Sequence, residues 1–193
     1  LGTNPIAIGV PAMPRPFVLD MATSLVSMGQ IHDHARRGEA IPGHWALDRH
    51  GNPTTDAAAA RDGAIAPFGE AKGYALGLAF EVLVASLTAS ALGRAVRGTL
   101  DATQICNKGD VFVVIDAPAA GAMAGMIGAY LDAIRADAPA EGFSRVSVPG
   151  DRSQAMREAR LRDGVPVTEA LWRELLALAE PEPGLSHARG TAT

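Results

Sequence analysis

The residues best placed to do chemistry lie in segment 16–24, where an apolar run ends in a carboxylate followed by hydroxyls. The run 17–19 is typical of a strand, Asp20 stands at its end, and Thr23 or Ser24 is placed to cap a following helix. At such a strand end, free helix N–H groups and a projecting carboxylate can bind a nucleotide, the aspartate accepting from ribose hydroxyls. An Asp20 that only caps the helix is the alternative, and no G-x-G-x-x-G fingerprint is present.

Two further segments carry cations at expected helix starts. Lys72 stands between the small residues Ala71 and Gly73, where a point charge beside free N–H groups suits an anion or phosphate. In the segment 148–153, Arg152 is placed to reach a phosphate or carboxylate. An ordinary solvated lysine and a solvated Arg152 beside a helix cap are equally good alternatives in isolation. A third polar segment, 106–110, is interpreted as a tight turn that leads into a strand.

Composition and charge exclude several classes of protein. A chain of 193 residues with 48% hydrophobic and 20% charged residues fits one soluble globular domain, or one domain with a lobe. A net charge of -4 and the lack of a basic run give no attraction to nucleic acid. The single cysteine, Cys106, excludes an internal disulfide and suits a reducing cytoplasm. The pair His32-x-His34 fits a solvated helix face better than a zinc site, so we expect no metal centre.

The elements that position these residues follow from apolar periodicity and turn residues. The predicted strands are 6–10, 17–20, 110–116 and 146–148. The predicted helices are 24–37, 73–92, 121–136, one from Ser153 to just before Gly164, and one from Thr168 with Leu171, Leu175, Leu176 and Leu178 on its core side. The segment 39–68 reads as a long connection, and 181–193 as a disordered tail.

The run 73–92 is long and apolar enough to need comparison with a membrane span. Glu81 lies at its centre, where a charge is costly in lipid, and Ser86, Thr88 and Ser90 dilute the run further. We therefore expect a buried core helix and no membrane association.

Several short motifs, taken in order, carry a resemblance that none of them carries alone. They are Gly2-Thr3-Asn4-Pro5, 18–24, Ile41-Pro42, 45–48, 51–56, Lys72-Gly73-Tyr74, 107–110 and 149–153. Their order and spacing resemble those of the malate/L-lactate dehydrogenase family, a group of non-Rossmann oxidoreductases, over about residues 1–180. The resemblance implies an α/β fold with a mostly antiparallel sheet wrapped by helices.

The family resemblance also implies an activity. The chain is expected to belong to a homodimeric NAD(P)-dependent oxidoreductase that moves hydride between nicotinamide and a small-molecule 2-keto or 2-hydroxy acid, or a 2-imino acid. The implied cofactor contacts are Pro16, Phe17, Val18, Leu19, Asp20, Met21 and Ala22, then Ala71 and Lys72, then Gly150, Asp151 and Arg152. Asp20 beside the adenosine ribose favours NAD over NADP, because it repels a 2′-phosphate.

The departures from the family concern catalysis. Family members carry a catalytic histidine in a Ser-His-Gly context, a substrate-binding arginine and a second histidine in an N-terminal region before the Gly2-Thr3-Asn4-Pro5 motif. None of the five histidines here has such a context, so no catalytic residue is assigned and the proton donor is expected upstream. Glu70-Ala71 and Ala75 stand where glycines are common, and Glu70 opposes anion binding nearby.

These expectations divide the chain into an NAD(P)-binding sheet domain at 1–150, helices at 151–180 that pack on the absent N-terminal region, and the tail. The chain is then an enzyme fragment that is inactive by itself. The alternative is a non-catalytic nucleotide-binding or assembly module that has kept the fold.

Overall fold

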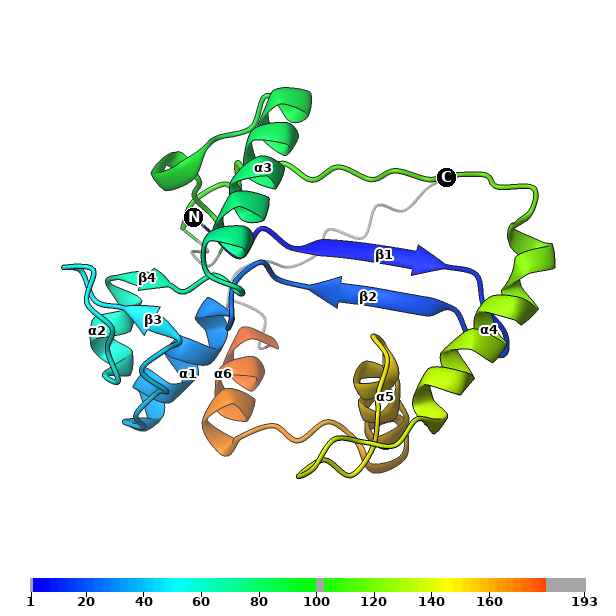
Figure 1. The fold of residues 1–193 in the computed structure, drawn as a ribbon. Coiled ribbons are helices and arrows are strands. Elements are labelled where there is room, and N and C mark those ends of the chain that lie inside the picture. The colour runs from blue at the N-terminus through cyan, green and yellow to red at the C-terminus, as the bar shows by residue number, and fades with distance from the viewer. Residues whose placement is uncertain (1, 100–102, 180–193) are drawn as a thin grey trace, which may run out of the picture. The chain divides into compact units, whose positions relative to one another are not determined.

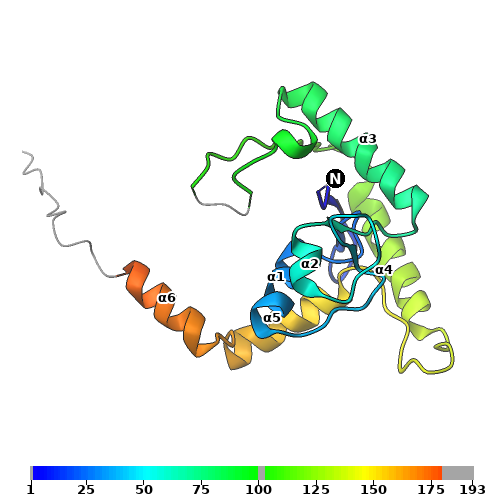
Figure 2. The ribbon, with the colours of Figure 1, turned by 90° about the vertical axis from the view of Figure 1, so that its left-hand side faces the viewer.

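A computed structural model describes residues 2–99 and 103–179, so the predicted tail at 181–193 lies outside the described residues. The chain divides into two compact units, Leu1–Gly150 and Asp151–Thr193. In the described residues the first unit holds two two-stranded antiparallel sheets, one of them a hairpin, and most of the helices, and the second holds two helices (Figures 1 and 2). The predicted α/β class with antiparallel pairing and surrounding helices is confirmed.

The longer hairpin joins β1 (Ile6–Val10) to β2 (Phe17–Met21), as the sequence predicts (Figure 1). Ile6 pairs with Met21 at the open end, and Val10 pairs with Phe17 beside the proline-rich turn. The antiparallel register sets the alternation of side chains, so that every second residue of β2 shares a face. It therefore fixes which side chains accompany Asp20.

Two short helices and two short strands follow the hairpin in the chain. They are α1 (Met28–Arg37), β3 (Ala46–Leu47), α2 (Ala57–Arg61) and β4 (Ala64–Ile65). These elements share one apolar core, built from Val26, Ile31, Ile41, Ala46, Ala57 and Ala60. The segment 39–68, predicted as a connection, thus contains three short elements of its own.

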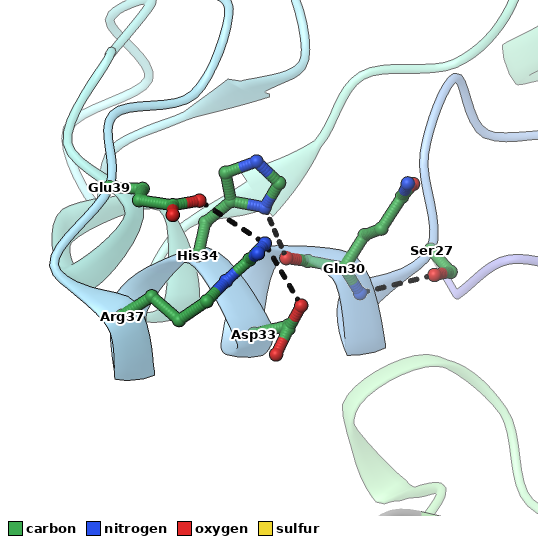
Figure 3. Close-up of polar contacts among 6 residues, drawn as sticks. All are labelled: Ser27, Gln30, Asp33, His34, Arg37 and Glu39. Atoms are coloured by element: carbon green, nitrogen blue, oxygen red, sulfur yellow. Dashed lines mark hydrogen bonds and ion pairs between the residues drawn. The ribbon is translucent and has the colours of Figure 1, made fainter. Parts of the chain in front are cut away.

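Helix α1 begins later than predicted. Its N-cap is Ser27, whose hydroxyl accepts from the Gln30 N–H at 3.2 Å, so the prediction of a cap at Thr23 or Ser24 is wrong (Figure 3). The reason is that residues 23–25 pair with the segment before α3 and stay extended. Gly38 follows the end of the helix at φ 68°, so the predicted last residue, 37, is confirmed.

The polar face of α1 carries ion pairs and hydrogen bonds between neighbouring residues. Arg37 bridges Asp33 at 3.0 Å and Glu39 at 3.2 Å, while His34 Nδ1 donates to the Gln30 carbonyl at 2.9 Å (Figure 3). The His34 ring also meets the Trp45 ring edge-on. These half-exposed ion pairs contribute little stability.

The turn after β3 is organised by Asp48. Its Oδ1 accepts from the backbone N–H groups of Asn52 at 2.9 Å and His50 at 2.8 Å. These two hydrogen bonds, that from Asn52 foremost, hold the pKa of the Asp48 carboxyl below its usual value. The turn cluster recognised in the sequence is thus stabilised by its own aspartate.

Helix α3 (Ala71–Thr88) corresponds to the predicted helix 73–92, but it is not buried in this chain. Only Gly73, Gly77 and Ala85 are buried. Phe80 and Val84 are half-buried, and the other large apolar side chains of the helix are exposed. The helix is apolar around its whole circumference. One face of small residues contacts the rest of the first unit, and the other faces stay uncovered.

Among the described residues, α3 is the one helix whose length and composition would allow it to cross a membrane, which alone is weak evidence. Its central carboxylate is tied to the fold. Glu81 Oε2 accepts from Asn4 Nδ2 at 3.0 Å, and Oε1 accepts from the Gly93 N–H at 2.5 Å. Asn4 Nδ2 also donates to the Gly77 carbonyl at 2.9 Å. The contacts of Asn4 hold α3 against the segment just before β1.

Helix α4 (Ala120–Ala136) packs against the turn of the longer hairpin, near the predicted bounds 121–136. The Met13 N–H donates to the Ala124 carbonyl at 2.9 Å, and Gly128 lies directly against the Met13 backbone. Leu131 joins a second apolar cluster with Ala12 and Val148. Small residues on α4 thus let the turn approach the helix closely.

Two predicted strands are not formed in the described residues. The segment 111–115 has no strand partner there, and its side chains are 40–94% exposed. The segment 146–148 also has no strand assignment, although Val148 is buried beside α4. A strand needs a neighbour for its backbone hydrogen bonds, and apolar composition alone does not provide one.

The second unit consists of α5 (Asp151–Asp163) and α6 (Glu169–Ala179). Helix α5 begins at Asp151 rather than after Ser153, and Gly164 follows its end at φ 85°. The Thr168 hydroxyl accepts from the Leu171 N–H at 3.4 Å, as expected of a cap. The leucines of α6 predicted to face a core are exposed in the chain alone.

The contact between α4 and the hairpin turn yields a paired prediction. A Cβ at Gly128 would overlap the Met13 carbonyl, so Gly128→Ala should lower the free energy of unfolding by roughly 1–3 kcal/mol. Gly125→Ala is the matched control, because a Cβ there meets nothing within 4 Å and should stabilise α4 by up to about 1 kcal/mol. Urea denaturation measures both. Equal stabilities for the two variants would contradict the packing.

Candidate cofactor site

One face of β2 carries the carboxylate singled out in the sequence. Val18 and Asp20 are exposed and alternate with the half-buried Phe17, Leu19 and Met21. Residues i and i+2 of a strand share a face, so Val18 and Asp20 project to the same side, about 7 Å apart along the strand. Asp20 therefore stands on an open face of the sheet.

Gly150 lies against that same face. A Cβ built on Gly150 would come 3.0 Å from the Val18 carbonyl oxygen and 3.7 Å from the Val18 Cβ. Its φ of 95° is in the region that favours glycine. The loop before α5 therefore crosses β2 one side-chain repeat from Asp20. Asp151 and Arg152 follow Gly150 directly and open α5 in the second unit.

The buried Thr23 connects the end of β2 to the start of α3. Its N–H and hydroxyl both donate to the Thr3 carbonyl, at 2.8 and 3.0 Å. Its own carbonyl accepts from the Phe68 N–H at 3.0 Å. Asp20 lies three residues before Thr23 and Lys72 four residues after Phe68, so these contacts bring the two predicted segments to one region of the fold.

The first turn of α3 is open to an anion. Ala71 and Lys72 are exposed, and the N-cap residue Glu70 makes no side-chain capping hydrogen bond. The Lys72 N–H itself donates to the Gly69 carbonyl at 3.1 Å. What this turn offers an anion is the Lys72 ammonium and the partial positive charge of the helix start, which has no side-chain acceptor from the cap. The buried Gly73 lies against the Phe68 backbone, which fixes this turn beside Thr23.

The backbone before this turn is strained. Gly69 has φ 55°, and Glu70 has φ 52° with ψ −119°, a conformation that costs a non-glycine residue about 1–3 kcal/mol. The family resemblance implies that glycines are common at Glu70-Ala71. A glycine at position 70 would adopt this conformation without strain.

Strand β2 and the residues just after it thus contact both of the other predicted segments. Gly150 lies against Val18, and Thr23 bonds to Phe68, which precedes Lys72 by four residues. The other predicted residues lie on the same elements: Pro16 is exposed in the turn before β2, and Ala22 is half-buried just after it.

Sequence reasoning missed the residues that hold the segments together. Thr23 was interpreted as a helix cap, and the Asn4–Glu81 contact was not foreseen. A signal was present, because Gly73 and Gly77 are four residues apart and so share one face of α3. A Cβ on Gly77 would stand 2.8 Å from the Thr23 hydroxyl, which identifies that face as the contact surface.

Two of the histidines, His34 and His50, have local partners. His34 contacts Gln30 and Trp45, and His50 accepts from the Arg49 guanidinium at 3.1 Å. Within residues 2–99 and 103–179, no group of three or more His, Cys, Asp and Glu side chains could hold a metal ion.

Comparison with known proteins is consistent with this geometry. Residues 1–176 match the Malate/L-lactate dehydrogenase family. L-sulfolactate dehydrogenase from Methanothermobacter thermautotrophicus is 38% identical over 179 residues, which are 93% of this chain and 52% of that protein. A Delta(1)-pyrroline-2-carboxylate/Delta(1)-piperideine-2-carboxylate reductase from Pseudomonas aeruginosa is 40% identical, covering 93% of this chain and 54% of the reductase.

Solved structures of dehydrogenases also match the fold of this chain. A dehydrogenase from Sinorhizobium meliloti matches with a TM-score of 0.80 and 46% identity, over 92% of this chain and 52% of its own. Sulfolactate dehydrogenase from Methanocaldococcus jannaschii matches with a TM-score of 0.79 and 37% identity, over 93% and 52%. The chain spans about half the length of the relatives it matches. By sequence and by fold, it belongs to the malate/L-lactate dehydrogenase family.

Proposed function

We propose that this chain supplies the NAD(P)-binding part of an oxidoreductase that transfers hydride between nicotinamide and a 2-hydroxy or 2-keto acid, or a cyclic 2-imino acid. The observation that supports the proposal is that the β2 segment contacts both other predicted segments: Gly150 lies against Val18, and Thr23 bonds to Phe68 just before α3. Relatives named for sulfolactate, malate and pyrroline-2-carboxylate support this substrate class.

The chemistry of the site fits a dinucleotide. The exposed Asp20 carboxylate can accept from two ribose hydroxyls, and the Lys72 ammonium, with the partial positive charge of the start of α3, can hold the pyrophosphate. Gly150 lets the loop backbone approach β2 without a side chain between them. Glu70 beside this turn weakens anion binding. Asp20 favours NAD, because its charge repels a 2′-phosphate.

In this proposal the described residues bind and orient the cofactor, and they do not donate the proton that the substrate needs. The bound cofactor gives or accepts the hydride. Reduction of a keto acid also needs an acid for the developing alkoxide. No histidine in the described residues is placed in the predicted catalytic context, so we assign the acid to the half of the enzyme that this chain does not match.

The remaining parts of the proposal concern assembly and compartment. Helices α5 and α6 are proposed to pack, through their exposed apolar side chains, on the other half of the enzyme. We further propose a homodimer in the cytoplasm, where the free thiol of Cys106 stays reduced.

The first prediction concerns the anion-binding turn. Lys72→Ala should weaken NADH binding by roughly 1–3 kcal/mol, the scale of one charge-assisted hydrogen bond. Lys108→Ala is the matched control, since that exposed lysine pairs with Asp110 at 2.7 Å and is assigned no cofactor contact. NADH fluorescence titration gives both affinities. Equal affinities would remove Lys72 from the site.

The second prediction concerns the loop on β2. Gly150→Ala should weaken NADH binding by about 1 kcal/mol or more, because a methyl group would press on the Val18 carbonyl and displace the loop. Gly142→Ala carries a similar backbone cost at φ 84°, but its Cβ meets nothing within 4 Å. If both variants bind NADH as the parent chain does, the loop does not border the cofactor.

The third prediction concerns activity. The chain by itself should not oxidise NADH with pyruvate or oxaloacetate, because the proposed proton donor lies in the unmatched half. Absorbance at the NADH band measures the rate. Oxidation well above the enzyme-free background would show that the chain holds its own acid.

A further inference from the structure

The segment 111–115, with the sequence Val-Phe-Val-Val-Ile, is an unpaired apolar run on the surface of the first unit. Phe112 is 89% exposed and Val114 is 94% exposed. A continuous apolar run of this kind is typical of a strand covered on both faces. In the described residues no backbone hydrogen bond joins this segment to a neighbouring strand.

The segment is nevertheless fixed at its start. Gly109 lies directly against Thr88 and Val84 near the end of α3. The Asn107 side chain donates to the Ala95 carbonyl at 3.0 Å and accepts from the Arg97 N–H at 2.7 Å. At its other end the chain passes into α4 at Ala120. The run therefore spans from α3 to α4.

Strand β1 spans the same two helices in the same direction. Just before β1, Asn4 bonds to Gly77 and Glu81 of α3. Just after it, Met13 bonds to Ala124 of α4. Figure 1 shows β1 and the segment running alongside each other between the two helices, with no element between them.

The anchor points on α3 give their separation. β1 is held at Gly77–Glu81 and the segment at Val84–Thr88, seven residues further along the helix. At 1.5 Å per residue this shift is about 10 Å. Neighbouring strands lie 4.7–4.9 Å apart, so about 10 Å corresponds to two strand spacings. This separation leaves room for one strand between the two segments.

We propose that one strand from the half of the enzyme not matched by this chain inserts between β1 and 111–115. Both flanking segments run in the same direction, as alternate strands of an antiparallel sheet do. The inserted strand therefore runs opposite to both, and it extends the hairpin to the order β2, β1, inserted strand, 111–115. It pairs the free edge of β1 and covers the backbone of the apolar run.

The occupant is assigned to that other half for two reasons. The relatives that match this fold are about twice as long, so such a polypeptide exists in each of them. A second copy is a poor donor, because its β1 and β2 already pair with each other and its 111–115 run is held at both ends. The proposal does not depend on cofactor binding.

The test uses the intact chain and the half of Methanocaldococcus jannaschii sulfolactate dehydrogenase that the match leaves uncovered. That half is supplied as a separate chain and also fused ahead of Leu1. Hydrogen exchange, read by mass spectrometry without cofactor, should slow by about tenfold or more at 6–10 and 111–115 together. Val113→Pro removes an amide donor from the run and should weaken binding of the separate half about tenfold.

Ile105→Pro is the matched control, because Ile105 is 93% exposed and precedes the anchored start of the run. It should leave the affinity within about twofold of the parent chain.

The proposal is overturned if 111–115 keeps exchanging freely in both arrangements, or if the two proline variants behave alike. Protection of 111–115 in the chain alone, with dimerisation, would instead identify a second copy as the occupant. Loss of NADH binding with protection intact would count against the proposed function and not against the inserted strand.

Discussion

The first unit depends on the contacts that Thr23 makes at the end of β2. Through two hydrogen bonds to Thr3 and one from Phe68, this buried residue joins both strands of the hairpin to the segment before α3. Gly77 provides the space for its side chain. Because those bonds keep residues 23–25 extended, α1 starts at Ser27, and the strand end at Asp20 is held beside the entrance to α3.

In this fold a glycine repeatedly allows two backbone segments to pack directly against each other. Gly73 against Phe68, Gly128 against Met13 and Gly150 against Val18 each replace a side-chain contact with a backbone contact. Such contacts fix geometry but bury little apolar area, so they do not cover α3 or the run 111–115. Exposed apolar surface of this extent marks sites of interaction, as the inserted strand proposed above requires.

The sequence predicted those elements whose partners lie close in the chain. The hairpin, α4 and the Gly38 end of α1 follow from local patterns, because turns and caps are decided by neighbouring residues. The burial of α3 and the strand at 111–115 were not realised, since both need neighbours that local pattern cannot supply. For the site, Asp20, Lys72 and Gly150 could be chosen from residue type, whereas Thr23 acts through long-range bonds that no periodicity reveals.

The central claim is that the end of β2, the start of α3 and the loop at Gly150 bind one nicotinamide dinucleotide. The most direct measurement is a heteronuclear NMR titration of the chain with NADH. The account predicts that the amides of 18–22, 69–73 and Gly150 shift together with one dissociation constant, while those of the turn at 48–52 do not move. Shifts confined to one of the three segments, or different constants for each, would contradict it.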